Sequence, residues 1–218
     1  MFSIPVLIKR WLVVFTIVLS CSFTTVTYAA DTSVNGVSAT ELLAKSNPFK
    51  NKLYDASYKK WTLIYTPEIP WYWHKAQGIA ESGLNPNAVS PVGAAGIGQF
   101  MPDTWSDMES RLNFKGSVFT PSLNIQSQIF YMSTLLNQFK KDRPIYDRYS
   151  LALASYNAGL GNILKAQMFG GGGLLYQPMI KALPKVTGTK HSTETRDYVN
   201  RIWQYIGILH NQEETTND

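Results

Sequence analysis

The sequence predicts an all-α fold, and three segments carry most of that prediction. Residues 70–82 form a helical run that ends at Gly83, where a helix commonly takes a left-handed residue. Thr120 and Pro121 open a segment that runs to residue 139, in which apolar side chains recur every three or four positions. Apolar residues of the same period run through residues 198–209. The two stripes predict helices that each bury one face in a core.

Residues 1–30 are typical of a secretory signal peptide. Two basic residues precede an apolar run at positions 11–21, and small or hydroxylated residues lead to a cleavage position after Ala29. The run is shorter than the roughly 20 residues that a membrane span needs. Two alternatives stay open: the segment is retained as an N-terminal anchor, or Cys21 marks a lipoprotein site. We expect an exported protein of the periplasm or cell envelope.

The composition is that of a globular protein with one sizeable core. The formal net charge of +5 falls to +3 once the signal leaves with Lys9 and Arg10, because 18 basic and 15 acidic residues remain. This mild excess favours anionic cell wall, and no basic cluster with interleaved aromatics predicts nucleic-acid binding. Cys21 is the only cysteine and leaves with the predicted signal, so we expect no internal disulfide in the mature chain. The three histidines are too scattered for a zinc site, and we predict no metal or cofactor.

Residues 31–66 are predicted to form a linker and a helical extension. A serine capping box opens a short helix at residues 38–45, and Pro48 can open a second helix. Two further prolines then interrupt the chain. We therefore expect the main domain at residues 67–212, followed by a polar, disordered tail at residues 213–218.

Glu81 stands in the last turn of the helix at residues 70–82. The carbonyl end of a helix carries partial negative charge, which favours the protonated acid, and apolar surroundings act in the same direction. A carboxylic acid that keeps its proton near neutral pH can protonate a leaving-group oxygen. His74 and Gln77 share the Glu81 face of the helix, and we interpret His74 as a packing residue.

A loop of small residues follows the Glu81 helix. Gly93, Gly96 and Gly98 leave its backbone free for unusual angles or for close approach to a ligand. Gln99 places an amide donor and acceptor just beyond the loop. Pro102 suits the first turn of the next helix.

Two later helices end or begin near residues of possible functional interest. A helix at residues 148–158 stops at a glycine, so Tyr156 and Asn157 lie in its last turn, as Glu81 does in its own. The final helix is expected to start near Ser192, with Glu194 in its first turn as a structural residue. Four consecutive glycines between these helices predict a mobile loop.

Taken in order, these motifs resemble the soluble lytic transglycosylase family, which cleaves the glycan strands of bacterial peptidoglycan and has a fold similar to goose-type lysozyme. The resemblance covers about residues 67–209 and rests on these sequences: Glu81-Ser82, Gly96-Ile97-Gly98-Gln99, Met101-Pro102, Thr104-Trp105, Ser155-Tyr156-Asn157-Ala158-Gly159, and Thr193-Glu194-Thr195-Arg196 with Tyr198-Val199. The resemblance implies an all-α, lysozyme-like (goose-type) domain with an N-terminal helical extension.

The resemblance also implies a mechanism and a set of site residues. Glu81 is expected to protonate the bond between N-acetylmuramic acid and N-acetylglucosamine, and then to act as base while the sugar's 6-hydroxyl closes a 1,6-anhydro ring. Ser82 is expected to position Glu81. The site is expected to be lined by Gln99, Tyr156 and Asn157, with the Tyr156 hydroxyl near the Glu81 carboxyl. No metal or cofactor enters.

Most glycosidases use two carboxylates, but substrate-assisted enzymes are exceptions. Asp103 and Asp107 follow the loop on a helix that we expect to point away from Glu81. One departure from the family concerns Gly98, which occupies a position where the family often has methionine. A substrate contact expected from that methionine is therefore missing.

Two other functions stay open at this point. A lysozyme-type hydrolase would let water replace the 6-hydroxyl, and a non-catalytic glycan-binding or secretion-assembly protein would keep only the fold. The expected partner is the peptidoglycan glycan strand, with no nucleic acid, and with a membrane only through an uncleaved N-terminal segment. The sequence does not identify protein partners in the cell wall or in secretion machinery.

Overall fold

The structure, a computed structural model, describes residues 47–140 and 142–217, and its regular elements there are helical. Between them, isolated bridges pair Val89 with Ala95 and Ala95 with Phe100. This confirms the predicted all-α fold. In chain order the helices are α2 (Asp55–Tyr65), α3 (Trp71–Ser82), α4 (Pro102–Arg111), α5 (Pro121–Leu136), η1 (Asn137–Phe139), α6 (Ile145–Ala158), α7 (Leu160–Phe169), α8 (Tyr176–Ala182) and α9 (Pro184–Asn217).

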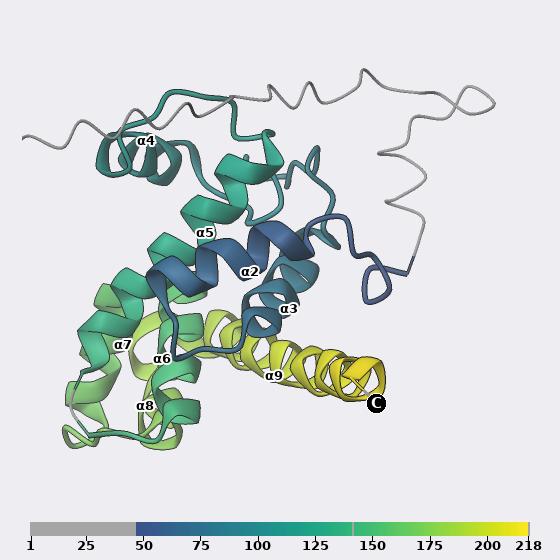
Figure 1. Cartoon of the computed structure of the whole chain (residues 1–218). Coiled ribbons are helices and arrows are strands. Elements are labelled where there is room, and N and C mark those ends of the chain that lie inside the picture. Colours follow the sequence, from purple (N-terminus) through teal and green to yellow (C-terminus); the bar gives the residue numbers. More distant parts are fainter. Residues whose placement is uncertain (1–46, 141, 218) are drawn as a thin grey trace, which may run out of the picture. The chain divides into compact units, whose positions relative to one another are not determined.

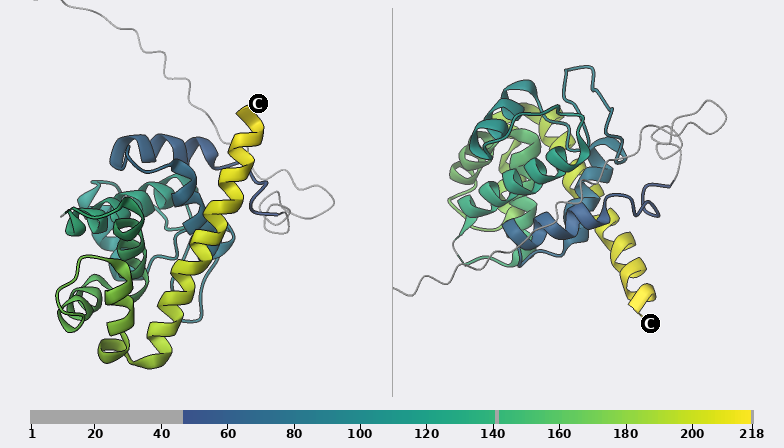
Figure 2. Two further views of the ribbon diagram at one scale, coloured as in Figure 1. Left: turned by 90° about the horizontal axis from the view of Figure 1, so that it is seen from below. Right: turned by 45° about the horizontal axis from the view of Figure 1, so that its top comes forward.

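The helices pack around the predicted stripes. In Figure 1, α2 lies against α3 and α5, while α3 and α6 both lie against the long helix α9. Figure 2 shows α9 extending along one side of the other helices to the C-terminal end of the chain. Fully buried side chains come from both stripes and from α6; they include Ile125, Ile129, Met132, Leu151, Leu153, Val199 and Ile202.

Local signals placed several helix ends correctly. Gly83 caps α3 with φ 64° and ψ 24°, which is the left-handed conformation that the sequence predicts there. Pro102 and Pro121 occupy the first positions of α4 and α5. These starts depend on the fixed φ of proline and on the missing N–H, which needs no partner in the first turn.

Other boundaries differ from the prediction. α6 begins at Ile145, earlier than expected, because Pro144 supplies the carbonyl that accepts from the N–H of Arg148 at 3.0 Å. α9 contains a break at Gly188 (φ 78°), and its helical backbone resumes before Ser192. It also continues through residues 213–217, where the sequence predicts a disordered tail; the ion pair from His210 to Glu214 at 3.3 Å supports this last part of the helix.

The helical extension at the start of the described chain contributes directly to the core. Tyr58 of α2 is fully buried, and the α3 side chain Lys75 is only 2% exposed. The Lys75 Nζ donates to Asp55 Oδ1 at 2.7 Å and to the carbonyl of Asn51 at 2.6 Å. A buried ammonium needs such partners, because an uncompensated charge in the interior is strongly destabilising. The Lys75 contacts therefore fix α2 to α3.

Replacing Asp55 with alanine is expected to lower the free energy of unfolding by about 2–3 kcal/mol, because Lys75 would stay buried with one partner fewer. Urea denaturation measures the change. The matched control is Asp107→Ala, which breaks the exposed pair with Arg111 and is expected to cost less than about 0.5 kcal/mol. Equal losses in the two variants would contradict a structural role for the buried pair.

Three predictions concern positions outside the described residues: the signal segment at 1–30, the Cys21 lipoprotein alternative and the short helix at 38–45. Within the described ranges, none of the helices combines the length and the hydrophobicity that crossing a bilayer requires.

Candidate functional site

Glu81 lies in the last turn of α3, and its side chain is partly exposed. Its Oε1 accepts a hydrogen bond from the hydroxyl of Tyr198 at 2.6 Å. Burial raises the pKa of Glu81 from 4.5 to about 7, although the Tyr198 hydrogen bond and the charge of Arg201 both act to lower it. A carboxyl group with this pKa can release a proton and take one up near neutral pH, as general acid–base catalysis requires.

The glycine loop packs beside the end of α3 and is held there by side chains from three helices. The Ser82 hydroxyl donates to the carbonyl of Ile97 at 2.9 Å. Both backbone groups of Gly98 are bound: its N–H donates to Asn124 Oδ1 at 2.7 Å, and its carbonyl accepts from the Tyr156 hydroxyl at 2.7 Å. Because these contacts satisfy the loop's backbone groups, they fix its position relative to Glu81.

Gln99 also contributes to the loop. Its backbone has φ 51°, which is uncommon for a residue with a side chain. Its Nε2 donates to the carbonyl of Gly96 at 2.9 Å and to that of Ala88 at 3.3 Å. The Gln99 side-chain amide thus links the two ends of the loop.

The structure shows which groups the predicted site residues bind. The Tyr156 hydroxyl binds the loop carbonyl, and the tyrosine bonded to Glu81 is Tyr198. Tyr156 lies near enough for the Glu81 charge to raise its pKa, after the larger effect of burial. The Ser82 hydroxyl binds the loop at Ile97, next to the end of the Glu81 helix. Two residues that the sequence analysis did not assign to the site are Tyr198 and Asn124.

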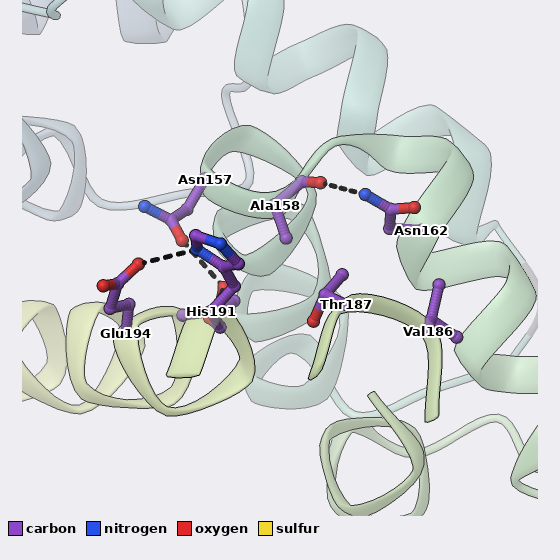
Figure 3. Close-up of a pocket in the computed structure, with 8 residues that line it drawn as sticks. Asn157, Ala158, Asn162, Val186, Thr187, His191 and Glu194 are labelled. Atoms are coloured by element: carbon purple, nitrogen blue, oxygen red, sulfur yellow. Dashed lines mark hydrogen bonds and ion pairs between the residues drawn. The ribbon is translucent and has the colours of Figure 1, made fainter. Parts of the chain in front are cut away.

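Asn157 lies at a separate, open cavity of about 410 Å³ between the end of α6 and the start of α9. Figure 3 shows Asn157, His191 and Glu194 grouped at one end of this cavity. The Asn157 Oδ1 accepts from Thr195 Oγ1 at 2.8 Å, and His191 pairs with Glu194 at 3.1 Å. Thr195 precedes Tyr198 by one turn of α9, so the cavity lies one turn from the hydroxyl that holds Glu81. Most of its lining residues are polar; the full set is Asn157, Ala158, Asn162, Val186, Thr187, His191, Glu194 and Thr195.

Comparison with known families shows which domain contains a similar sequence. The model of the transglycosylase SLT domain matches residues 65–169, a range that contains Glu81, the glycine loop and Tyr156. Residues 65–169 are thus similar to the transglycosylase SLT domain.

Two curated relatives and a solved structure agree with this assignment. A membrane-bound lytic murein transglycosylase F from Shewanella loihica is 29% identical over 66% of this chain and 32% of its own length. The soluble lytic murein transglycosylase from Escherichia coli K12 is 27% identical over 71% of this chain and 24% of its own. The crystal structure of the 70 kDa soluble lytic transglycosylase from Escherichia coli has a TM-score of 0.57 at 26% identity, over 73% of this chain and 24% of that one.

These comparisons confirm the resemblance and the lysozyme-like helical fold. The chain spans about a third of the length of the membrane-bound relatives that it matches. The matched SLT domain ends at residue 169, yet the hydroxyl that holds Glu81 comes from α9 beyond it. The Tyr198-Val199 motif was the sequence signal for this contact.

The remaining candidates are one buried histidine and two exposed aspartates. His74 is fully buried, and its Nε2 lies 2.8 Å from Thr66 Oγ1, in agreement with the packing interpretation. Asp103 and Asp107 have exposed side chains on α4, and Asp107 pairs with Arg111. In the described part of the chain, no group of three or more His, Cys, Asp or Glu side chains could hold a metal ion.

Proposed function

We propose that this chain is a peptidoglycan lytic transglycosylase that cleaves between N-acetylmuramic acid and N-acetylglucosamine. The observation that carries the proposal is Glu81: a partly exposed acid with a pKa raised to about 7, next to a loop of fixed backbone in an SLT domain. The names of the relatives describe the same activity on murein.

In the proposed reaction, Glu81 donates its proton to the glycosidic oxygen while the N-acetyl group of the muramic acid assists at the anomeric carbon. The leaving sugar departs as an alcohol. Glu81 is then a carboxylate and takes the proton from the 6-hydroxyl, whose oxygen attacks the anomeric carbon and displaces the N-acetyl oxygen. The ring closes as a 1,6-anhydro sugar, and Glu81 is protonated again. One carboxyl therefore serves both steps.

The surrounding residues have different tasks in this proposal. Tyr198 stabilises the carboxylate that forms between the two steps. Ser82 and Tyr156 keep the loop beside Glu81, where its backbone and Gln99 border the glycan. The cavity at Asn157 would bind a further part of the glycan.

The loop geometry gives a reason for the departure at Gly98. A Cβ at this position would lie 3.1–3.2 Å from side-chain atoms of Phe100, Asn124 and Tyr156. Those contacts are tighter than ordinary packing, so a methionine here would displace the groups that hold the loop. We infer that Gly98 leaves room for the groups that hold the loop, while the substrate contact of a methionine is absent.

We further infer export to the cell envelope, from the signal-like residues 1–30 and from relatives named as membrane-bound murein enzymes. In this organisation residues 31–66 connect the exported N-terminus to a catalytic domain at residues 67–212.

Mass analysis of the products from purified peptidoglycan tests the function. The wild-type protein is expected to release muropeptides that end in 1,6-anhydro-muramic acid, which are lighter by one water than hydrolysis products. Reducing-end products would replace the proposal with a lysozyme-type hydrolase. Binding to glycan without any cleavage would favour the non-catalytic alternative.

A further inference from the structure

A chain of four side-chain hydrogen bonds leads from the interior to the acid. Tyr58 Oη donates to Gln128 Oε1 at 3.3 Å, and Gln128 Nε2 donates to Gln77 Oε1 at 3.1 Å. Gln77 Nε2 then donates to Tyr198 Oη at 3.2 Å, and Tyr198 donates to Glu81 Oε1. The two glutamines and Tyr58 are fully buried. Members from α2, α5, α3 and α9 thus meet in one network whose last acceptor is Glu81.

A backbone carbonyl fixes the direction of these bonds. Gln128 Nε2 also donates to the carbonyl of His74 at 3.0 Å. Because a carbonyl oxygen only accepts, the NH₂ group of Gln128 must face it, and its second N–H then faces Gln77. The Gln77 oxygen is the acceptor there, so its own NH₂ group is turned toward Tyr198.

This direction determines what the Tyr198 hydroxyl can do. The hydroxyl has one proton, and its oxygen already accepts from Gln77. Among the described residues its proton has one acceptor, Glu81 Oε1. Oε1 is therefore kept as an acceptor in both protonation states of Glu81, and a proton on the carboxyl group must reside on Oε2.

We propose that Gln77 and Gln128 are positioning residues that hold Tyr198 as a one-way donor and so assign the catalytic proton of Glu81 to Oε2. The catalytic role of this proton rests on the proposed function, whereas the hydrogen-bond network does not. A fixed location for the proton means that only one carboxyl oxygen exchanges it, first with the glycosidic oxygen and then with the 6-hydroxyl.

The network also affects when Glu81 changes its charge. Donation by Tyr198 favours the carboxylate, and aligned hydrogen bonds strengthen one another in a low-dielectric interior. Without the Gln77 contact, Tyr198 becomes a weaker donor and is free to accept a proton from Glu81 instead. Both changes favour the neutral acid, so the pKa of Glu81 would rise above its value of about 7.

The test uses Gln77→Met and Gln128→Met, which remove the amide groups at nearly constant volume. The matched control is Gln126→Met. Gln126 lies on α5, as Gln128 does, and donates to the Tyr65 hydroxyl at 3.0 Å, outside the network. ¹³C NMR of the carboxyl carbons measures the pKa of Glu81 in the full chain without substrate, and the resonance is assigned by its absence in Glu81→Gln. We expect Gln77→Met to raise this pKa by about half to one unit, since a hydrogen bond contributes about 1 kcal/mol.

Gln128→Met is expected to shift the pKa in the same direction by less, and Gln126→Met to leave it unchanged. The high-pH limit of glycan cleavage should move with the NMR value in each variant. An unchanged pKa of Glu81 in folded Gln77→Met would overturn the proposal. If that variant does not fold, a raised pKa of Glu81 in Gln128→Met supports the proposal, and an unchanged or lowered one overturns it. A shifted pKa in a protein that cleaves no glycan would uphold the network and reject the proposed function.

Discussion

Replacing Glu81 with glutamine is expected to remove glycan cleavage and to leave the fold and glycan binding in place. The amide has almost the shape of the acid, and its oxygen can still accept from Tyr198, so the contact at the end of α3 survives. The amide cannot donate the catalytic proton. General acid–base assistance is typically worth about 10²–10⁴-fold, and one residue serves two steps here, so we expect a loss of at least about 10⁴-fold in rate.

Release of soluble muropeptides from purified peptidoglycan measures this loss, and co-sedimentation with the insoluble glycan measures binding. The control is Glu109→Gln, which removes the charge of another partly buried glutamate. Glu109 lies on α4, where it accepts from the N–H of Gly116 and from Lys115. We expect this variant to keep most of its activity. Cleavage near the wild-type rate by Glu81→Gln would exclude Glu81 from the mechanism.

The same pair of proteins also carries a stability signature. The pKa of Glu81 is raised from 4.5 to about 7 in the folded protein, so between these pH values the folded state binds more protons than the unfolded state. The free energy of unfolding of the wild type therefore falls as pH rises through this window. Glu81→Gln lacks this group. Its Tm relative to the wild type is expected to be higher at pH 8 than at pH 5, and the reverse order would contradict the raised pKa.

The sequence was sufficient for the features that depend on neighbouring residues. The end of α3 at Gly83 needs only a residue that tolerates positive φ, and the starts of α4 and α5 need only proline in the first turn. Glu81 could be singled out for the same reason, since its position in the last turn follows from where the helix stops.

The partner of Glu81 could not be predicted in this way. Tyr156 and Tyr198 both belong to motifs of the family, and each ends up close to the site. Which hydroxyl reaches the carboxylate depends on how α9 packs against α3, a contact between residues 117 positions apart. Local patterns contain no information on that packing angle. The same holds for Asn124. It is buried on α5 together with core residues, and the sequence gives no reason to assign it a different role.

A second large effect is expected for a substitution in the glycine loop. Gly96 has φ +77°, and a Cβ there would overlap Asn124 Nδ2 and lie 2.5 Å from the carbonyl oxygen of Val118. Gly96→Ala therefore combines an unfavourable backbone angle with a clash against main chain that cannot rotate away. We expect the free energy of unfolding to fall by about 2–5 kcal/mol, from about 1–2 kcal/mol of left-handed backbone and about 1–3 kcal/mol of overpacking.

Gly93→Ala separates the two causes. Gly93 has φ +89° in the same loop, but a Cβ there meets nothing within 4 Å, so we expect only the backbone cost of about 1–2 kcal/mol. The two variants are also expected to differ in glycan-cleaving activity. In Gly96→Ala the displaced Asn124 releases the N–H of Gly98 and the loop moves relative to Glu81, for which a loss of about 10²-fold is expected, because a shift of about 1 Å has that effect. Urea denaturation and muropeptide release, measured below the unfolding midpoint, give both numbers. Equal behaviour of the two alanine variants would mean that the close packing of Gly96 against Asn124 does not set the position of the loop.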